Sequence, residues 1–258
     1  MLPIQFNNFA NLHNGIDTFF CKTDYLPQLF AELQNYEVPS TLISGNSDYP
    51  IVDGLVDMAP SCITRWFGQC INTDKTHVFP LPYGLENTEE CIRTGHGVGY
   101  PERICKVETA KNPPQRTPLK STYANFGLNT HGERKELSHI CKQASHITCN
   151  IAEVCWDRPY DIFVNEVLDH EMVVCPRGNA PAETHRFWEV LYMNRIPIIK
   201  LNKGNSFFTE LPVIVLNDWN QLEDTTFLLE ELKRVKNNPT RMLDMSYWVD
   251  LILKKYEN

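Results

Sequence analysis

The sequence lacks the marks of several protein classes. Its net charge is −8 over 258 residues, whereas a general nucleic-acid binder needs a basic face. No apolar run approaches the ~18–20 residues that span a bilayer. Residues 1–15 are polar and rich in asparagine, unlike the basic and apolar start of a secretory signal. We therefore expect a soluble, cytoplasmic protein that binds no nucleic acid and does not span a membrane.

Cysteine pairs at metal-binding or redox spacing are also absent. The chain has nine cysteines, an odd number, and no Cys-x-x-Cys pair. This usage favours reduced, mostly buried thiols in a reducing compartment over a disulfide framework or a structural zinc site. The composition, 42% hydrophobic and 22% charged, is that of an ordinary globular protein. At this length, one large domain or two small ones are possible.

Short apolar runs alternate with helical patterns in the first third of the chain. Strands are predicted at residues 18–21, 40–44, 62–67 and 77–81, with helices at 26–36 and 51–58. Such alternation is typical of a parallel sheet. Residues 87–119, which are rich in glycine and proline, are instead expected to form an irregular segment, with at most a short helix, that leads to a domain boundary near residue 119.

A second α/β set follows that boundary. Strands are predicted at residues 121–126, 146–149, 172–175, 196–199 and 213–216, and helices at 132–145, 158–169, from 183, at 222–235 and at 240–256. We expect an N-terminal acceptor-binding domain at 1–118, a nucleotide-sugar-binding domain at 119–239, and a final helix at 240–258 that packs back on the first domain. Ligands collect outside the carboxyl ends of parallel strands, so two such halves imply a cleft between them.

Residues 175–200 are the most informative stretch. They predict a strand, a turn at Gly178, a helix and a second strand. Asn179 has the residue type of a helix cap. Arg186 and Glu189 lie three positions apart on one side of the helix. The unit offers backbone N–H groups and an arginine for a pyrophosphate, and a carboxylate for ribose hydroxyls, so a sugar nucleotide fits it.

The same stretch resembles the donor-binding signature of the exostosin-like glycosyltransferases. It contains Cys-Pro-Arg-Gly-Asn, then Thr-His-Arg-Phe-Trp-Glu, then Ile-Pro-Ile-Ile. The matching positions are Thr184, Arg186, Glu189, Ile196 and Pro197. Residues 123–127 with Arg134 are similar to the opening of that family's nucleotide-binding domain, and residues 45–48 and 81–86 look like positions of short microbial and viral members.

The resemblance implies a two-domain GT-B architecture, in which two Rossmann-like α/β domains face each other across a cleft. It implies an inverting, metal-independent transfer from a UDP-sugar to a hydroxyl of a glycan acceptor, with a carboxylate of the N-terminal domain as general base and no further cofactor. The sequence contains no Asp-x-Asp motif, which agrees with metal independence. A neutral sugar, and among these a pentose such as xylose, is the donor that we favour. The lack of a signal is compatible with a cytosolic microbe or a large DNA virus.

On the donor side, Glu189 is the expected ribose ligand, the alternative being an exposed glutamate paired with a neighbour on its helix. Arg186 is expected on the diphosphate, the alternative being a surface ion pair of little energetic value. The remaining donor candidates are Arg134, Arg177, Gly178, Asn179, Thr184 and His185. Of these, Arg134 has a helix contact as its alternative role, Asn179 a capping role, and His185 a packing role.

The general base is expected in the N-terminal half, near a strand end. Asp48 is the first candidate, with Asp24 and His13 as alternatives, and a turn aspartate that bonds its own backbone is the structural alternative for Asp48. Trp66, Tyr83 and Glu86 are candidates for acceptor binding. An aromatic ring can stack on a sugar, although burial in the core explains Trp66 equally well.

Two other functions compete with glycosyl transfer. A nucleotide-sugar-modifying enzyme, such as an epimerase, or a dinucleotide oxidoreductase would use a related sheet. However, no Gly-x-Gly-x-x-Gly occurs, and the glycines at 95, 97 and 99 follow no predicted strand. A non-catalytic sugar- or nucleotide-binding protein is the second alternative, and it would keep Arg186 and Glu189 while lacking the base.

Overall fold

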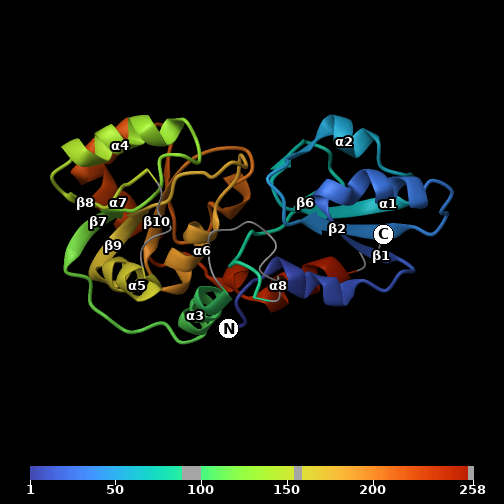
Figure 1. The fold of residues 1–258 in the computed structure, drawn as a ribbon, viewed down its shortest axis with the longest axis horizontal. Helices are drawn as coiled ribbons and strands as arrows, with labels where there is room; N and C mark the ends of the chain where they lie inside the picture. Colours follow the sequence, from blue (N-terminus) through green and yellow to red (C-terminus); the bar gives the residue numbers. More distant parts are fainter. Residues whose placement is uncertain (89–99, 154–158, 255–258) are drawn as a thin grey trace.

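The protein consists of two lobes, each built around a parallel β-sheet (Figure 1). This computed structural model describes residues 1–88, 100–153 and 159–254. The α/β class and the parallel sheets predicted from the alternating pattern are confirmed. Within the described residues, no helix is long and apolar enough to cross a membrane.

The N-terminal lobe contains a four-stranded sheet in which the strands follow one another in chain order, β1-β2-β4-β6. Their bounds are Thr18–Lys22, Ser40–Gly45, Ile63–Gly68 and Val78–Pro80. All neighbours pair in parallel. One face packs on α1 (Leu26–Glu32) and α2 (Asp53–Asp57), through a buried cluster that includes Phe30 and Trp66.

The helix expected at residues 51–58 is shorter than predicted. Ile51–Val52 forms a two-residue strand, β3, which pairs in parallel with β5 (Ile71–Asn72), and α2 begins only at Asp53. The pairing partner lies 20 positions further along the chain, so local helical spacing gave no sign of it.

The C-terminal lobe contains a five-stranded parallel sheet in the order β11-β10-β9-β7-β8. These strands are Ile214–Leu216, Ile196–Lys200, His170–Val174, Lys120–Ala124 and Ile147–Cys149. This order is that of a doubly wound sheet whose topological switch point lies between its first and third strands. Here these are β7 and β9, so the end of this strand pair is the expected place for a ligand.

Helices cover both faces of the second sheet because its strands are apolar on both sides. Met172 and Val174 pack toward α4 (Glu133–Gln143) and α7 (Thr225–Val235), whereas Val173 packs toward the opposite cluster. That cluster contains α5 (Tyr160–Asp169) and α6 (His185–Tyr192). A near-continuous apolar strand buried on both faces is what a parallel sheet requires.

The segment between the sheets contains a longer helix than the sequence indicated. Residues 87–119 were expected to be irregular with a short helix, but α3 spans twelve residues, Tyr100–Lys111, and packs against α6. Val107 and Ala110 are buried in the core. The glycines at 95, 97 and 99 lie outside the described residues.

The chain returns to the N-terminal lobe through its last helix, α8 (Met245–Leu253), which runs beneath the junction of the lobes (Figure 1). Arg65 of β4 donates hydrogen bonds to the carbonyls of Leu251 and Ile252, at 3.1 and 3.0 Å. The Met245 N–H donates to the Leu2 carbonyl at 2.9 Å. The C-terminal helix therefore packs on the first lobe.

The lobes share a hydrophobic core at their base. One buried cluster includes Ile4 and Phe67 of the first lobe, Trp188 of α6 and Trp248 of α8. The hydroxyl of Tyr192 accepts from the Ile4 N–H at 2.8 Å and donates to the Leu243 carbonyl at 2.7 Å. These contacts fix the lobes at one end and leave the strand ends facing each other at the other.

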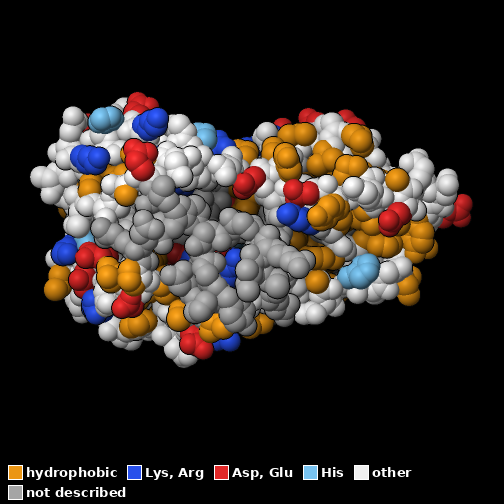
Figure 2. Space-filling view, viewed as in Figure 1, with side chains coloured by type: hydrophobic (Ala, Val, Ile, Leu, Met, Phe, Trp, Pro, Cys, Tyr) orange, Lys and Arg blue, Asp and Glu red, His pale blue; other side chains and the backbone are white. Residues whose placement is uncertain are grey.

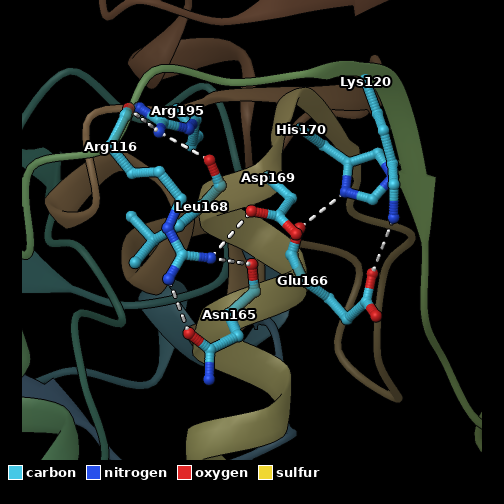
Figure 3. Close-up of polar contacts among 8 residues, drawn as sticks. All are labelled: Arg116, Lys120, Asn165, Glu166, Leu168, Asp169, His170 and Arg195. Carbon is cyan, nitrogen blue, oxygen red and sulfur yellow. Dashed lines mark hydrogen bonds and ion pairs between the residues drawn. The ribbon is translucent and has the colours of Figure 1, made fainter.

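A polar cluster anchors the segment that enters the second sheet (Figure 3). Arg116 donates to Asp169 Oδ1 at 2.7 Å and to Asn165 Oδ1 at 3.0 Å, both on α5. Arg195 then donates to the carbonyls of Arg116 and Leu168, each at 2.7 Å. The cluster lies where β7 and β9 begin, at the opposite end of the sheet from the switch-point crevice.

Candidate functional site

A cavity of about 720 Å³ lies where the two lobes meet. Residues of both lobes line it. They include Lys22, Asp24, Asp48, Tyr49, Tyr83, Glu86, Lys106, Asn125, Arg134, Gly178, Asn179, Glu183, Thr184, His185, Arg186 and Glu189. Clefts of this size accommodate small-molecule ligands and cofactors.

The carboxyl ends of both sheets open onto this cavity. In the first lobe, Asp24 follows β1, Asp48 follows β2 and Gln69 follows β4. In the second lobe, Asn125 follows β7 and Gly178 follows β9, the two strands of the switch point. A ligand in the cavity is therefore within reach of groups from both sheets.

The N-terminus of α6 forms part of the cavity wall. Thr184 is its N-cap residue, with extended backbone and no capping hydrogen bond from its side chain. The interpretation of Asn179 as the cap is thus corrected, because its side chain instead donates to Asp48 Oδ2 at 3.2 Å. First-turn N–H groups without a side-chain cap favour an anion at such a position.

Arg186, in the first turn of α6, is held by groups of the second lobe. Its Nη1 donates to Asn125 Oδ1 at 3.1 Å, and its guanidinium lies 4.8 Å from the centre of the Phe163 ring. Its buried Nε has no hydrogen-bond partner among the described residues. The guanidinium thereby lines the cavity and forms no ion pair with a described carboxylate, so its positive charge can act on an anionic ligand.

Lys106 of α3 bridges two buried carboxylates. Its Nζ lies 2.6 Å from Glu86 Oε1 and forms a second ion pair with Glu189 Oε1. Burial opposes ionisation of Glu86, but Lys106, with help from His185, holds the pKa of that carboxyl at about 2. Burial likewise opposes the charge on Lys106, but the two carboxylates raise its pKa.

This bridge corrects the alternative role considered for Glu189, which was an exposed glutamate paired with a neighbour on its own helix. Glu189 is only 4% exposed and lines the cavity. The sequence analysis missed Lys106 because it lies in the segment interpreted as irregular. The apolar spacing of Val107 and Ala110 was the signal of a helix there.

Glu183 is a second residue that the sequence analysis missed. It lines the cavity, yet it is only 5% exposed. Its Oε1 accepts from the Tyr83 N–H at 2.9 Å and from Trp188 Nε1 at 3.2 Å. Burial raises the pKa of Glu183 to about 7, although these hydrogen bonds oppose the shift. The sequence predicted a helix from residue 183, whereas α6 begins at His185, so Glu183 lies just before the N-cap residue and only its burial reveals its role.

Several contacts cross from one lobe to the other beside the cavity. His185 Nδ1 lies 2.8 Å from the Gly84 carbonyl, and Lys203 pairs with Asp74 at 2.8 Å. Gly84 has φ of +64°, and a Cβ there would lie 2.3 Å from the Ile4 carbonyl oxygen. Glycine is therefore required at the loop that carries Tyr83.

Arg134 holds the turn that follows β9. Its guanidinium donates to the carbonyls of Gly127 at 3.0 Å and Arg177 at 2.7 and 2.9 Å. Arg177 in turn donates to the Asn179 carbonyl at 2.9 Å. These bonds engage most of the Arg134 donors, so its contacts favour shaping the turn over direct phosphate binding.

No family model matches the sequence, and no curated protein is similar to it. Among solved structures, the chain is similar to the crystal structure of TarM, at 8% sequence identity and a TM-score of 0.44. The match covers 96% of this chain and 57% of TarM, so the chain spans a little over half the length of that protein.

The structure brings together most of the predicted residues, but three of them, Trp66, His13 and Arg177, do not line the cavity. Trp66 is fully buried, donates from Nε1 to Ser44 Oγ at 2.7 Å and packs edge-on against Phe30. It has no open face for a sugar, so its assignment to acceptor binding is corrected to a core role. His13 lies outside the cavity lining, and its Nδ1 is 3.0 Å from the Thr18 carbonyl.

The other acceptor-side candidates do line the cavity. Asp24 lies 3.6 Å from Lys22, and Asp48 is exposed. Tyr83 is 9% exposed, and its hydroxyl donates to the Ser47 carbonyl at 2.9 Å. Within residues 1–88, 100–153 and 159–254, no group of three or more His, Cys, Asp or Glu side chains is arranged to hold a metal ion.

Proposed function

We propose that this chain is an inverting glycosyltransferase that moves a sugar from a UDP-sugar to a hydroxyl of a glycan acceptor without a bound metal ion. One observation carries the proposal. The carboxyl ends of two parallel sheets open onto a single cavity, with an arginine and a helix N-terminus on one side and exposed carboxylates on the other. Two substrates that react with each other need such a shared site.

The donor belongs on the second lobe, at the end of the switch-point strands. Its diphosphate fits against the first turn of α6, with Arg186 and Gly178 beside it. Glu189 lies one helical turn further along α6 and supports hydrogen bonding to the ribose hydroxyls. Positive charge at the diphosphate lowers the barrier because negative charge develops there as the sugar leaves.

The acceptor belongs on the first lobe. Tyr49 lines the cavity and is 66% exposed, and Tyr25, just after β1, is 59% exposed. Hydrophobic side chains also gather on this lobe on the face shown in Figure 2. Exposed aromatic rings offer flat apolar surfaces of the kind that pack against the C–H faces of sugar rings. Asp48 and Asp24 are the carboxylates of this lobe that line the cavity, and Asp48 is the base that the sequence proposes.

The charge of the cavity wall favours a neutral donor sugar. On the acceptor side, the exposed carboxylates Asp24 and Asp48 line it. A uronic acid would place a further negative charge among them, at a cost in binding free energy. Hydroxyl groups would instead donate hydrogen bonds to these oxygens, which supports a neutral hexose or a pentose such as xylose.

The test is a donor panel. The protein is incubated with UDP, GDP, NAD and the UDP derivatives of xylose, galactose, N-acetylglucosamine and glucuronic acid, and its melting temperature and UDP release are measured. Stabilisation by UDP but not by NAD or GDP, together with slow UDP release from a neutral UDP-sugar, supports the proposal. Stabilisation without release, even in the presence of an acceptor library, supports a non-catalytic binding protein. If no UDP compound raises the melting temperature and no UDP is released, both the glycosyltransferase and the non-catalytic binding protein are contradicted.

A further inference from the structure

Two buried carboxyl groups of the cavity wall lie in opposite electrostatic surroundings. Glu86 forms an ion pair with Lys106, which holds its pKa at about 2. Glu183 forms no ion pair in the described part of the chain, and burial raises its pKa to about 7. A carboxylate of very low pKa is a poor proton acceptor at neutral pH, whereas one titrating near 7 is matched to proton transfer.

The position of Glu183 suits a proton acceptor between two substrates. Its Oε1 receives one hydrogen bond from each side, from the Tyr83 N–H of the first lobe and from Trp188 Nε1 of α6. Glu183 also directly precedes Thr184, the N-cap of the helix at which the diphosphate is proposed to bind. Both of these bonds go to Oε1, and Glu183 lines the cavity between the two lobes.

Asp48 is less suited to this role. It is exposed, and its Oδ2 accepts from Asn179 of the other lobe at 3.2 Å. Asn179 thereby engages one of its two carboxylate oxygens. These contacts favour a role for Asp48 in holding the two lobes together at the cavity.

We propose that Glu183 is the general base of the transfer, an inference that rests on the proposed function. Its ionised carboxylate accepts the proton of the attacking hydroxyl while that oxygen forms a bond to the anomeric carbon. The bond from this carbon to the phosphate oxygen breaks, and UDP leaves with the electron pair. The protonated Glu183 then returns its proton to solvent.

Cys70 and Tyr83 are titratable neighbours of Glu183 with raised pKa values, and His185, two positions further along the chain, lines the same cavity. Burial raises the pKa of Cys70 to about 12, with the charge of Glu183 adding to the shift. Burial also raises the pKa of Tyr83 well above its ordinary value. A rate that rises through pH 7 and loses this dependence when Glu183 is replaced can be assigned to Glu183.

The experiment measures UDP released from the UDP-sugar that the wild type hydrolyses fastest, with water as acceptor, between pH 5.5 and 8.5. It compares the wild type with Glu183→Gln, Asp48→Asn and, as a control, Glu210→Gln at an exposed glutamate. We expect a wild-type rate that rises with an inflection near pH 7. In Glu183→Gln the rate falls by about 100-fold or more and the inflection disappears, while the Kd for UDP changes by less than about 3-fold.

The outcomes separate the two claims. If Glu183→Gln still binds UDP and hydrolyses the UDP-sugar with the wild-type pH profile, the role of Glu183 is overturned. The same holds if Asp48→Asn loses more of the hydrolysis rate than Glu183→Gln and also loses the inflection. If Glu183→Gln does not fold, the role of Glu183 is tested with Glu183→Asp and with the pH–rate profile of the wild type. A wild-type rate without an inflection between pH 6 and 8 overturns the inference. A wild type that binds no UDP removes the proposed function, and the role of Glu183 with it.

Discussion

Lys106 and Glu189 form a buried ion pair that joins the helix between the lobes to the helix at the cavity. Glu86 shares the same ammonium group, at 2.6 Å. The ribose ligand that the sequence proposes is therefore not an isolated surface carboxylate. It belongs to a charged network that connects the first lobe, α3 and α6.

Replacing Lys106 tests how much this network stabilises the fold. Lys106→Met leaves two carboxylates buried without a counter-charge, and breaking a buried pair in this way costs about 3–5 kcal/mol. Urea denaturation at pH 7 measures the loss in the free energy of unfolding. Lys111→Met, at the exposed end of the same helix, is the matched control and should cost little. A loss below 1 kcal/mol for Lys106→Met would show that the buried network contributes almost nothing.

Glu183 should make stability depend on pH in a predictable direction. Its pKa is about 7 in the folded protein and 4.5 as the ordinary value, so the folded state holds the proton more tightly. Protonated Glu183 therefore stabilises the folded state at low pH, and this stabilisation is lost as the pH rises through 7. The free energy of unfolding should fall by roughly 2–3 kcal/mol between pH 5 and pH 8. Glu183→Gln lacks this loss, so its stability relative to the wild type should rise over that interval. Equal pH dependence of the two proteins in chemical denaturation would refute the burial effect.

Glu189→Gln should weaken UDP binding through the ribose. Hydrogen bonds to a charged group contribute about 1.5–3 kcal/mol, so the loss in affinity should be at least tenfold. Calorimetry with UDP and with 2′,3′-dideoxy-UDP separates this contact from the rest. The wild type should prefer UDP, and Glu189→Gln should bind both ligands with nearly equal affinity. If Glu189→Gln still binds UDP more tightly than 2′,3′-dideoxy-UDP, another residue binds the ribose hydroxyls.

Arg186→Met should act on the diphosphate rather than on the nucleoside. The affinity for UDP should fall by tenfold or more, whereas the weaker affinity for uridine should change little, because only UDP carries the charge that Arg186 meets. Arg116→Met, in the polar cluster at the far end of the second sheet (Figure 3), is the control. It removes a partly exposed ion pair and should leave UDP binding unchanged. Equal losses for UDP and uridine in Arg186→Met would point to a structural role.

The sequence predicts the two sheets well because their strands carry an unambiguous pattern. Runs such as residues 172–174 and 196–199 are apolar and short, and they lie in the buried parallel strands β9 and β10. The pairing of β3 with β5 was not predictable in the same way, since it depends on the close approach of residues 20 positions apart. Local spacing favoured a helix there.

The candidate site is harder to predict because it depends on burial. Glu189 and Arg186 were found through their positions on a helix after a strand, and both line the cavity. Lys106 was missed because glycine and proline around it suggested an irregular segment. Glu183 was missed because sequence alone does not reveal that a carboxyl group is buried between two lobes. Trp66 illustrates the opposite error, since this aromatic residue within β4 is part of the core and not of an acceptor site.

The most direct measurement is the structure of a co-crystal grown with UDP. The account predicts the diphosphate against the first turn of α6 within hydrogen-bond distance of Arg186, and the ribose hydroxyls on Glu189. A nucleotide bound outside the cavity, or no nucleotide at millimolar UDP, would contradict the account.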